Sequence, residues 1–394
     1  MMDQKYAVNA SASHSQEARW VWVRRRLTVL SQHLSPTSMG CSGSRPSTDL
    51  SAYGVAVGVN GSGASAPRAQ FANGHANDFC NGITAGNAPG QWISCGEDKK
   101  VIVADWHAQR VVTTWCGHDK GVNRVIAAPH VGGALSASRD TTVKLWKANE
   151  DTAALTLKKH ELSVQAIGLA DDGSKALSGS RDYSLCLWDL AAGALVNTVS
   201  ISRNVVTCLR WVPGEPHLVV QGSEDLRLRL WDVRTLSKPA ATIEGKFTYF
   251  PLCVDSDGPY VATGSNGFDG VGCEVRVWDR RTMTQLHELR GHEQGVTGVA
   301  FLRGSGGGGD TLQQRLVGSG CKDGTVRVWD ANTGTCTAQS DIGNGASVTG
   351  LAAARADETQ QGVRLYASCS EGHVHALAIE GQGLHVVATG APAE

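Results

Sequence analysis

The stretch GHDKGVNRVIAAPHVGGALSASRDTTVKLW, from Gly117 to Trp146, contains the pattern that decides the fold. A Gly-His pair is followed by an apolar run, then by Ser-x-Ser-x-Asp, and then by alternating apolar residues that end in Trp. The same order recurs in two further stretches, which end at Trp188 and Trp329. Recurrence of this kind indicates a repeated structural unit rather than a single functional site.

The place held by Trp146 marks seven units along the chain. Shorter copies end at Trp231 and Trp278, and weaker copies at the two ends of the series have Ala104 and Leu377 in the Trp place. Successive units are 42 to 51 residues apart. A period just above about 40 residues, with these signatures, is typical of four short strands per unit arranged in a ring. We therefore expect an all-β fold, a seven-bladed β-propeller of four-stranded antiparallel blades over residues 73–394.

Residues 1–72 lack the repeat and are rich in Ser, Gly and Ala, so we expect a disordered N-terminal extension there. Within it, the basic stretch from Ala18 to Leu30 fits a short amphipathic helix, part of a transit peptide or an unstructured leader. At the other end, Leu384 to Thr389 can supply the outermost strand of the last blade. A strand around Phe71 would supplement closure of the ring.

Composition excludes several classes of function. The formal net charge is −1, whereas nucleic-acid-binding surfaces are usually strongly basic, so no nucleic-acid partner is expected. The 11 cysteines are scattered singly without a CxxC motif, and they indicate buried thiols in a reducing compartment. No cofactor or metal site is expected, and no apolar stretch is long enough to span a membrane.

Ser, His and Asp, the components of a catalytic triad, occur in three of the repeats together with Trp. Because a triad occurs once and these sets recur, we interpret them as structural hydrogen-bond networks that run from Trp to Ser to His to Asp. No motif for nucleophilic, metal-dependent or phosphate chemistry occurs, and an enzyme is not expected. The three expected tetrads are His118, Ser136, Asp140, Trp146; His160, Ser178, Asp182, Trp188; and His292, Ser319, Asp323, Trp329.

We expect partners to bind at two kinds of position: the residue before each turn Asp, and the places where a unit departs from the repeat. The residue before each turn Asp should lie at the narrow end of the ring, near the central channel. Arginine there suits carboxylates of a docked peptide or protein loop. The alternative is that these are solvated turn residues. Including departures from the repeat in the fourth and fifth units, the candidates are Arg139, Arg181, Arg203, Asn204, Glu224, Asn266, Phe268 and Lys322.

These repeats resemble the WD-repeat propeller family, and the resemblance covers the chain from His75 onward. It implies a protein-interaction scaffold rather than an enzyme. Two segments outside the regular pattern, Ile201 to Asp232 and Ser265 to Asp279, resemble more closely a member of that family that works at cilia or flagella. That closer resemblance implies recruitment of trafficking complexes and of small-GTPase regulators.

The N-terminal segment contains one sharp motif, MGCSGS, which begins at Met39. If translation starts there, Gly40 fits an N-myristoylation signal and Cys41 is placed for palmitoylation. Two acyl chains would anchor the protein to a membrane, whereas one binds only marginally. The alternative is chance occurrence inside a Gly/Ser-rich leader.

Two functions are considered, and the sequence favours the first over the second, which is the alternative. The first is a membrane-associated adaptor in ciliary or flagellar trafficking, cytoplasmic or ciliary in location, that recruits transport complexes and small-GTPase regulators. The second is a substrate receptor or subunit of a nuclear or RNA-handling multiprotein complex. The fold alone does not choose between binding partners.

Overall fold

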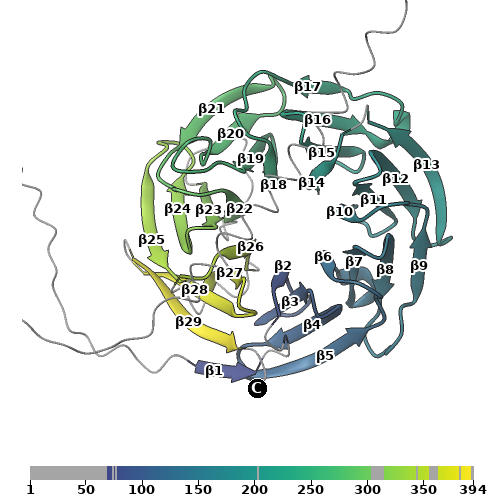
Figure 1. Cartoon of the computed structure of the whole chain (residues 1–394), viewed down its shortest axis with the longest axis horizontal. Helices are drawn as coiled ribbons and strands as arrows, with labels where there is room; N and C mark the ends of the chain where they lie inside the picture. Colours follow the sequence, from purple (N-terminus) through teal and green to yellow (C-terminus); the bar gives the residue numbers. More distant parts are fainter. Residues whose placement is uncertain are drawn as a thin grey trace, which may run out of the picture. The chain divides into compact units, whose positions relative to one another are not determined.

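The computed structural model describes residues 69–72, 75, 78–201, 204–302, 315–342, 345–354, 363–380 and 383–391. Seven sheets stand around a central axis, as Figure 1 shows. The seven-bladed propeller expected from the repeats is confirmed. In the described part of the chain, no helix has the length and hydropathy of a membrane span.

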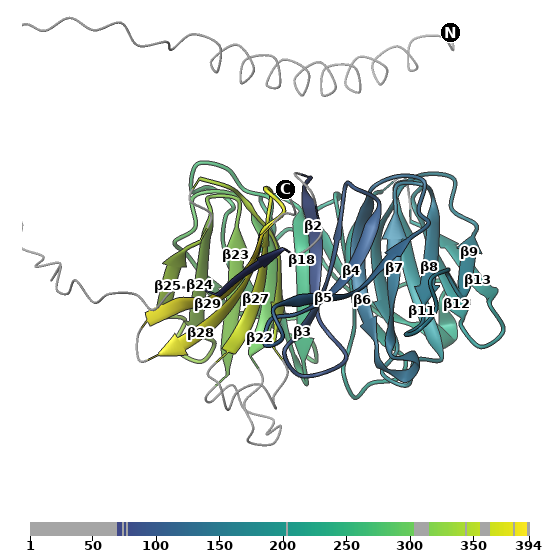
Figure 2. The same cartoon turned by 90° about the horizontal axis from the view of Figure 1, so that it is seen from below.

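Each blade has four antiparallel strands in chain order, from the innermost strand at the axis to the outermost strand at the rim. Seen from the side in Figure 2, the strands run between the two faces of the ring. Blades 1 to 4 consist of β2 (Cys80–Ala85), β3 (Gln91–Gly96), β4 (Lys100–Asp105), β5 (Arg110–Cys116); β6 (Val122–Ala128), β7 (Gly133–Ser138), β8 (Thr142–Trp146), β9 (Leu155–Lys158); β10 (Val164–Leu169), β11 (Lys175–Ser180), β12 (Ser184–Asp189), β13 (Ala194–Ser200); and β14 (Val206–Trp211), β15 (Leu218–Ser223), β16 (Arg227–Asp232), β17 (Ala241–Ile243).

Blades 5 to 7 follow the same order, and two short 3-10 helices lie in loops outside the strands, η1 (Pro129–Val131) and η2 (Val233–Thr235). The strands of these blades are β18 (Pro251–Asp257), β19 (Tyr260–Ser265), β20 (Val275–Asp279), β21 (Thr284–Leu289); β22 (Val296–Leu302), β23 (Leu316–Cys321), β24 (Thr325–Asp330), β25 (Cys336–Asp341); and β26 (Val348–Ala353), β27 (Val363–Cys369), β28 (Val374–Glu380), β29 (Gly383–Ala391).

The hydrophobic core is divided among the seven interfaces between neighbouring blades. Each of seven clusters of buried side chains draws on two adjacent blades, including one cluster that joins blade 7 to blade 1. Glycine in the second strand permits this close approach. A Cβ on Gly179 would lie 2.4 Å from Cγ1 of Val206 in the next blade, and one on Gly264 would lie 2.5 Å from Cγ1 of Val296. The residue between the two Ser positions is therefore small because the next blade packs against it.

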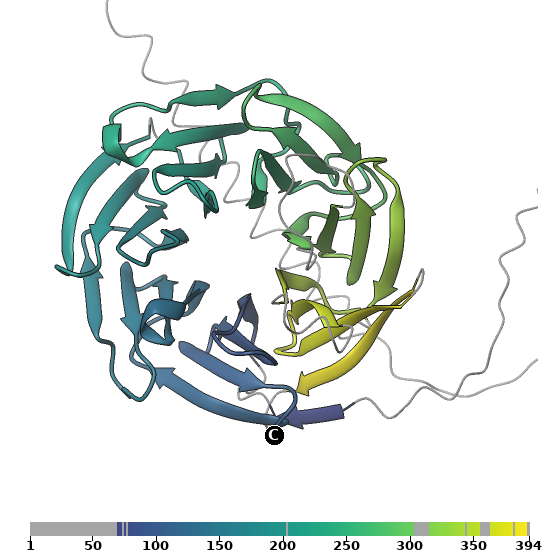
Figure 3. The same cartoon turned by 180° about the vertical axis from the view of Figure 1, so that it is seen from behind.

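The ring closes through an added strand. Four residues assigned above to the N-terminal extension form β1 (Ala69–Ala72), which pairs in parallel with β29. The strand expected around Phe71 is therefore present, and it extends the sheet of the last blade at its outer edge. Figures 1 and 3 show β1 on the outer rim, where β29 and β5 meet. The outermost strand expected from Leu384 to Thr389 is confirmed as part of β29.

The ring of His375 on β28 is buried, and its Nδ1 lies 3.0 Å from Oγ1 of Thr389 on β29. All ten described cysteines are free, and eight are buried as expected. Cys116 and Cys336, however, are exposed because they lie on the outermost strands of blades 1 and 6.

Candidate functional site

The tetrads of blades 2 and 3 are closed hydrogen-bond networks. The indole N–H of Trp146 donates to Oγ of Ser136 at 2.8 Å, and Ser136 Oγ lies 2.8 Å from Nε2 of His118. On the other side of the imidazole, Nδ1 lies 2.7 Å from the carboxylate of Asp140. Blade 3 repeats these contacts in His160, Ser178, Asp182 and Trp188 at 2.8 to 2.9 Å.

The turn Asp in these networks also shapes the turn that follows it. Asp140 accepts from the backbone N–H and the hydroxyl of Thr142. Although burial alone would raise it, the hydrogen bonds from His118 and Thr142 hold the pKa of Asp140 well below its usual range. Serine is bonded to both Trp and His, and it faces no open site. The networks therefore join the Asp turn to the strands, as a structural role requires.

Blade 6 carries a looser version of the tetrad. Trp329 donates to Ser319 at 2.8 Å, and Ser319 Oγ lies 2.7 Å from Nε2 of His292. The distance from His292 Nδ1 to Asp323 is 3.6 Å, longer than in blades 2 and 3. Cys321 brings a thiol into the same cluster, but burial raises the pKa of this thiol to about 12. The thiol donates to the backbone oxygen of Gln294 at 3.0 Å and accepts from the backbone N–H of Asp323 at 3.4 Å, so it is hydrogen-bonded within the turn.

Blades 4 and 5 replace the missing His with arginine from the third strand. In blade 4, Arg229 is bonded to the turn carboxylate of Asp225 and donates to Ser223 at 3.1 Å. In blade 5, Arg276 is ion-paired with Glu274 at 2.7 Å. Both arginines are nearly fully buried and lie two residues before the blade's Trp. The sequence analysis missed them, and the available signal was an Arg at that place together with loss of the Gly-His pair.

One face of the ring is defined by a hydrogen bond that every blade makes. The residue that opens the turn between the second and third strands donates its backbone N–H to the residue just before an inner strand, at 2.8 to 3.1 Å. We call this the Asp-turn face. Its seven donors are Glu97, Arg139, Arg181, Glu224, Asn266, Lys322 and Ser370. The candidate rim residues therefore hold equivalent positions around one face, with Asn266 and Ser370 completing the series.

Neighbouring blades pair some of these rim side chains. Arg139 makes an ion pair with Glu97 at 2.6 Å, and its Nε donates to Asn123. Lys322 donates to the amide oxygen of Asn266 at 2.8 Å. Arg139 and Lys322 therefore already use part of their hydrogen-bonding capacity within the ring.

Arg181 and Glu224 are exposed on the neighbouring blades 3 and 4. Partial burial raises the pKa of the Glu224 carboxyl, and the positive charge of Arg181 opposes that shift. Asn204 lies just before β14, the first strand of blade 4, and its backbone N–H donates to the backbone oxygen of Ile201. Arg203 lies outside the described residues, as do Gly40 and Cys41.

Blade 5 presents a group of exposed apolar side chains on the Asp-turn face. The loop between β19 and β20 is closed by a bridge between Phe268 and Val271, whose side chains are 60% and 56% exposed. Tyr249, which precedes β18, is also exposed, and its ring lies against Gly272 of that loop. We call Tyr249, Phe268 and Val271 the blade-5 patch. The sequence analysis named only Phe268 of the three, because a repeat pattern does not show the loop conformation that places Gly272 against Tyr249.

The comparisons with known proteins agree with this architecture. The family model described as WD domain, G-beta repeat matches residues 109–147, 152–189, 193–232 and 283–330. The chain is similar to a ribosome biogenesis protein WDR12 homolog of Drosophila mojavensis, with 26% identity over 64% of this chain and 62% of the relative.

Two further relatives are similar at comparable identity. Pre-mRNA-processing factor 19 of Caenorhabditis elegans is 28% identical over 41% of this chain and 33% of its own length. Methylosome protein WDR77 of Xenopus laevis is 27% identical over 51% and 58%. The chain thus spans less than two thirds of the length of each of these relatives. They do not support the more specific resemblance, to WD repeat-containing protein 31. With four matched repeats, seven four-stranded blades and recurring tetrads, the chain belongs to the WD40-repeat family.

Proposed function

We propose that this protein is a non-enzymatic interaction scaffold that works as a subunit or substrate receptor of a nuclear or RNA-handling multiprotein complex. The blade-5 patch is the observation that carries a docking role, because one loop and the residue before β18 present two exposed aromatic rings and a valine on the Asp-turn face. Aromatic side chains are enriched in the cores of protein interfaces, and clustered exposed apolar groups mark such sites. The polar rim beside the patch suits the edge of an interface.

The choice of complex draws support from the relatives. The names of two of them refer to ribosome biogenesis and pre-mRNA processing. Contact with such complexes is proposed to be through proteins, since the net charge of −1 does not favour direct nucleic-acid binding. A role as a ciliary or flagellar membrane adaptor rests on WD repeat-containing protein 31 and on Gly40 and Cys41, and the comparisons give it no support.

Affinity purification of the tagged full-length chain, followed by mass spectrometry, tests this proposal. The patch variant carries Phe268→Ser and Val271→Ser. The matched control carries Leu195→Ser and Val196→Ser on outer strand β13, where both side chains are also exposed. Wild type and control should enrich ribosome-biogenesis or RNA-processing proteins, and the patch variant should lose them. Enrichment of ciliary membrane and trafficking components instead would overturn the proposed complex, and equal capture by all three chains would overturn the docking site.

A further inference from the structure

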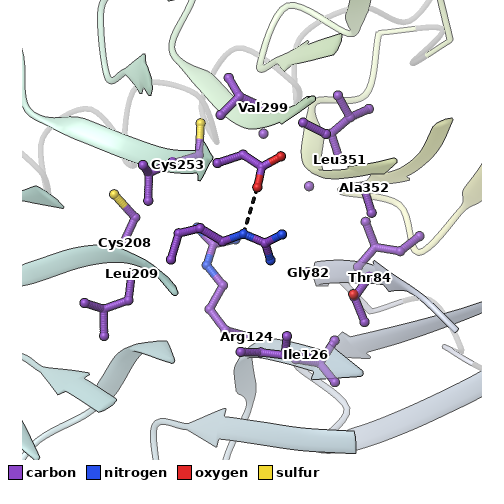
Figure 4. A pocket seen from close by; sticks show the side chains of 18 of the residues that line it. Gly82, Thr84, Arg124, Ile126, Cys208, Leu209, Cys253, Val299, Leu351 and Ala352 are labelled. Atoms are coloured by element: carbon purple, nitrogen blue, oxygen red, sulfur yellow. Dashed lines mark ion pairs between the residues drawn. The ribbon is translucent and has the colours of Figure 1, made fainter. Parts of the chain in front are cut away.

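The inner strands of all seven blades enclose a cavity of about 510 Å³ along the axis of the ring. Figure 4 labels Arg124 among the side chains that line the channel, and three of the lining residues are charged. They are Arg124 from blade 2, Arg210 from blade 4 and Asp255 from blade 5. The rest of the wall is mainly backbone and apolar side chains.

At one level of the channel, most inner strands carry a small residue, and this leaves space for a long side chain. Every inner strand has a register shift before its third residue, which lies at this level. Six of the seven residues there are glycine, alanine or cysteine, and the seventh is Arg124. The other six are Gly82, Ala166, Cys208, Cys253, Gly298 and Gly350.

The Arg124 side chain uses this space to cross the channel. Its Nη2 lies 3.5 Å from the backbone oxygen of Leu252, three blades further along the chain. That partner is a neutral carbonyl. In the described part of the chain, no ion pair joins Arg124 to a carboxylate.

The single carboxylate that lines the cavity already has two partners within the protein. One oxygen of Asp255 lies 2.8 Å from Nε of Arg210 in an ion pair, and the other accepts from the backbone N–H of Phe301 at 2.8 Å. One negative charge thus faces two guanidinium groups, so the lining carries a net charge of +1. A half-buried guanidinium in surroundings of low polarity favours an anionic partner.

We propose that the central channel is a binding site for an anionic ligand, with a carboxylate or phosphate group held between Arg124 and Arg210. Guanidinium groups bind both kinds of oxyanion through charge-assisted, often bidentate hydrogen bonds. The cavity has the size of sites that take small organic molecules, about 300–1,000 Å³. The anionic group therefore belongs to a larger body, either a small organic acid or phosphate or the acidic side chain of a bound peptide. This site is separate from the blade-5 patch and stands independently of the proposed function.

Isothermal titration calorimetry of the full-length protein at constant ionic strength tests the site. The probes are inorganic phosphate, acetate, and the capped tripeptides acetyl-Gly-Glu-Gly-amide and acetyl-Gly-Gln-Gly-amide. Saturable binding of an oxyanion, but not of the Gln peptide, is the expected result. Tighter binding of the Glu peptide than of acetate would identify a peptide side chain as the source. Comparable binding of the small anions would identify a free ligand.

Three variants separate the site from nonspecific charge effects and from misfolding. Arg124→Gln should weaken anion binding at least tenfold. Asp255→Asn should strengthen it, because the lining then carries two positive charges and no negative one, and an unfolded variant could not bind more tightly. Arg110→Gln, on outer strand β5, removes a positive charge outside the channel and should change nothing. Failure of the wild type to bind any oxyanion at millimolar concentration, or equal binding by Arg124→Gln, would overturn the proposal.

Discussion

The indole N–H of Trp106 donates a hydrogen bond to the phenolic oxygen of Tyr366 at 3.2 Å, and this contact joins the first blade to the last. Tyr366 is completely buried, and its ring lies 5.6 Å from that of Trp92 between the ring centroids. Blades 1 and 7 both lack the tetrad Trp, so aromatic packing across their interface takes over part of the stabilising role that the tetrad has elsewhere.

Tyr366→Phe should destabilise the ring at this interface. The substitution keeps the ring packing but leaves the Trp106 N–H without this acceptor, which costs about 1–3 kcal/mol when the donor is buried. Urea denaturation followed by Trp fluorescence measures the change in the free energy of unfolding. Tyr183→Phe is the control, because its side chain is exposed in the turn of blade 3. Equal stability of wild type and Tyr366→Phe would show that the hydrogen bond contributes nothing to closure.

Ser178→Ala should destabilise the protein by a similar amount, about 1–3 kcal/mol. It removes the acceptor of the Trp188 indole and the partner of His160 Nε2 in a single step. Ser200→Ala, at the exposed end of strand β13, should stay within about 0.5 kcal/mol of wild type. Chemical denaturation of both variants compares the two free energies. A Ser178→Ala chain as stable as Ser200→Ala would contradict the structural interpretation of the tetrad.

The sequence predicted the ring and the complete tetrads because both depend on local residues that recur at a fixed spacing. It did not predict the contacts made across blades. Trp106 and Tyr366 are 260 positions apart, and neither belongs to the repeat. Arg276 replaces a histidine that lies outside the third strand, so it is found only when the Arg before the Trp and the loss of the Gly-His pair are considered together. The sequence did not reveal the charged groups of the channel. Arg124 and Asp255 lie at different positions along their inner strands, and only the closed ring places these strands around one channel.

Stability should decline as the pH rises from near neutrality to about 9, partly through His160. Burial disfavours protonation of the ring, but the Asp182 carboxylate and the Cys186 thiol outweigh it and raise the pKa of His160 to about 9. The ordinary value in an unfolded chain is about 6.5. Stabilisation by a group whose pKa is raised on folding is fully present below the unfolded value and is lost as pH rises through the folded one.

Unfolding free energies at several pH values between 6.5 and 9 check this prediction. His160→Gln should remove most of the decline. His292→Gln should not, because burial lowers the pKa of His292 and its Asp323 partner is more distant. Parallel pH profiles for wild type and His160→Gln would exclude His160 as the source.

Arg276→Met should be among the most destabilising substitutions in blade 5. It leaves the carboxylate of Glu274, itself nearly fully buried, without its cation, and breaking a buried pair in this way costs about 3–5 kcal/mol. The cation–π contact between Arg276 and Phe247, at 5.3 Å, is lost as well. Adding Glu274→Met to Arg276→Met should recover part of that loss, since the unpaired charge then disappears. A double-mutant cycle by urea denaturation measures the coupling, and Arg281→Met, at an exposed pair with Asp279, should cost no more than about 1 kcal/mol. The double variant could instead lose as much free energy of unfolding as the two single variants combined. Arg276 and Glu274 would then be energetically independent, and arginine would not substitute for the missing tetrad histidine.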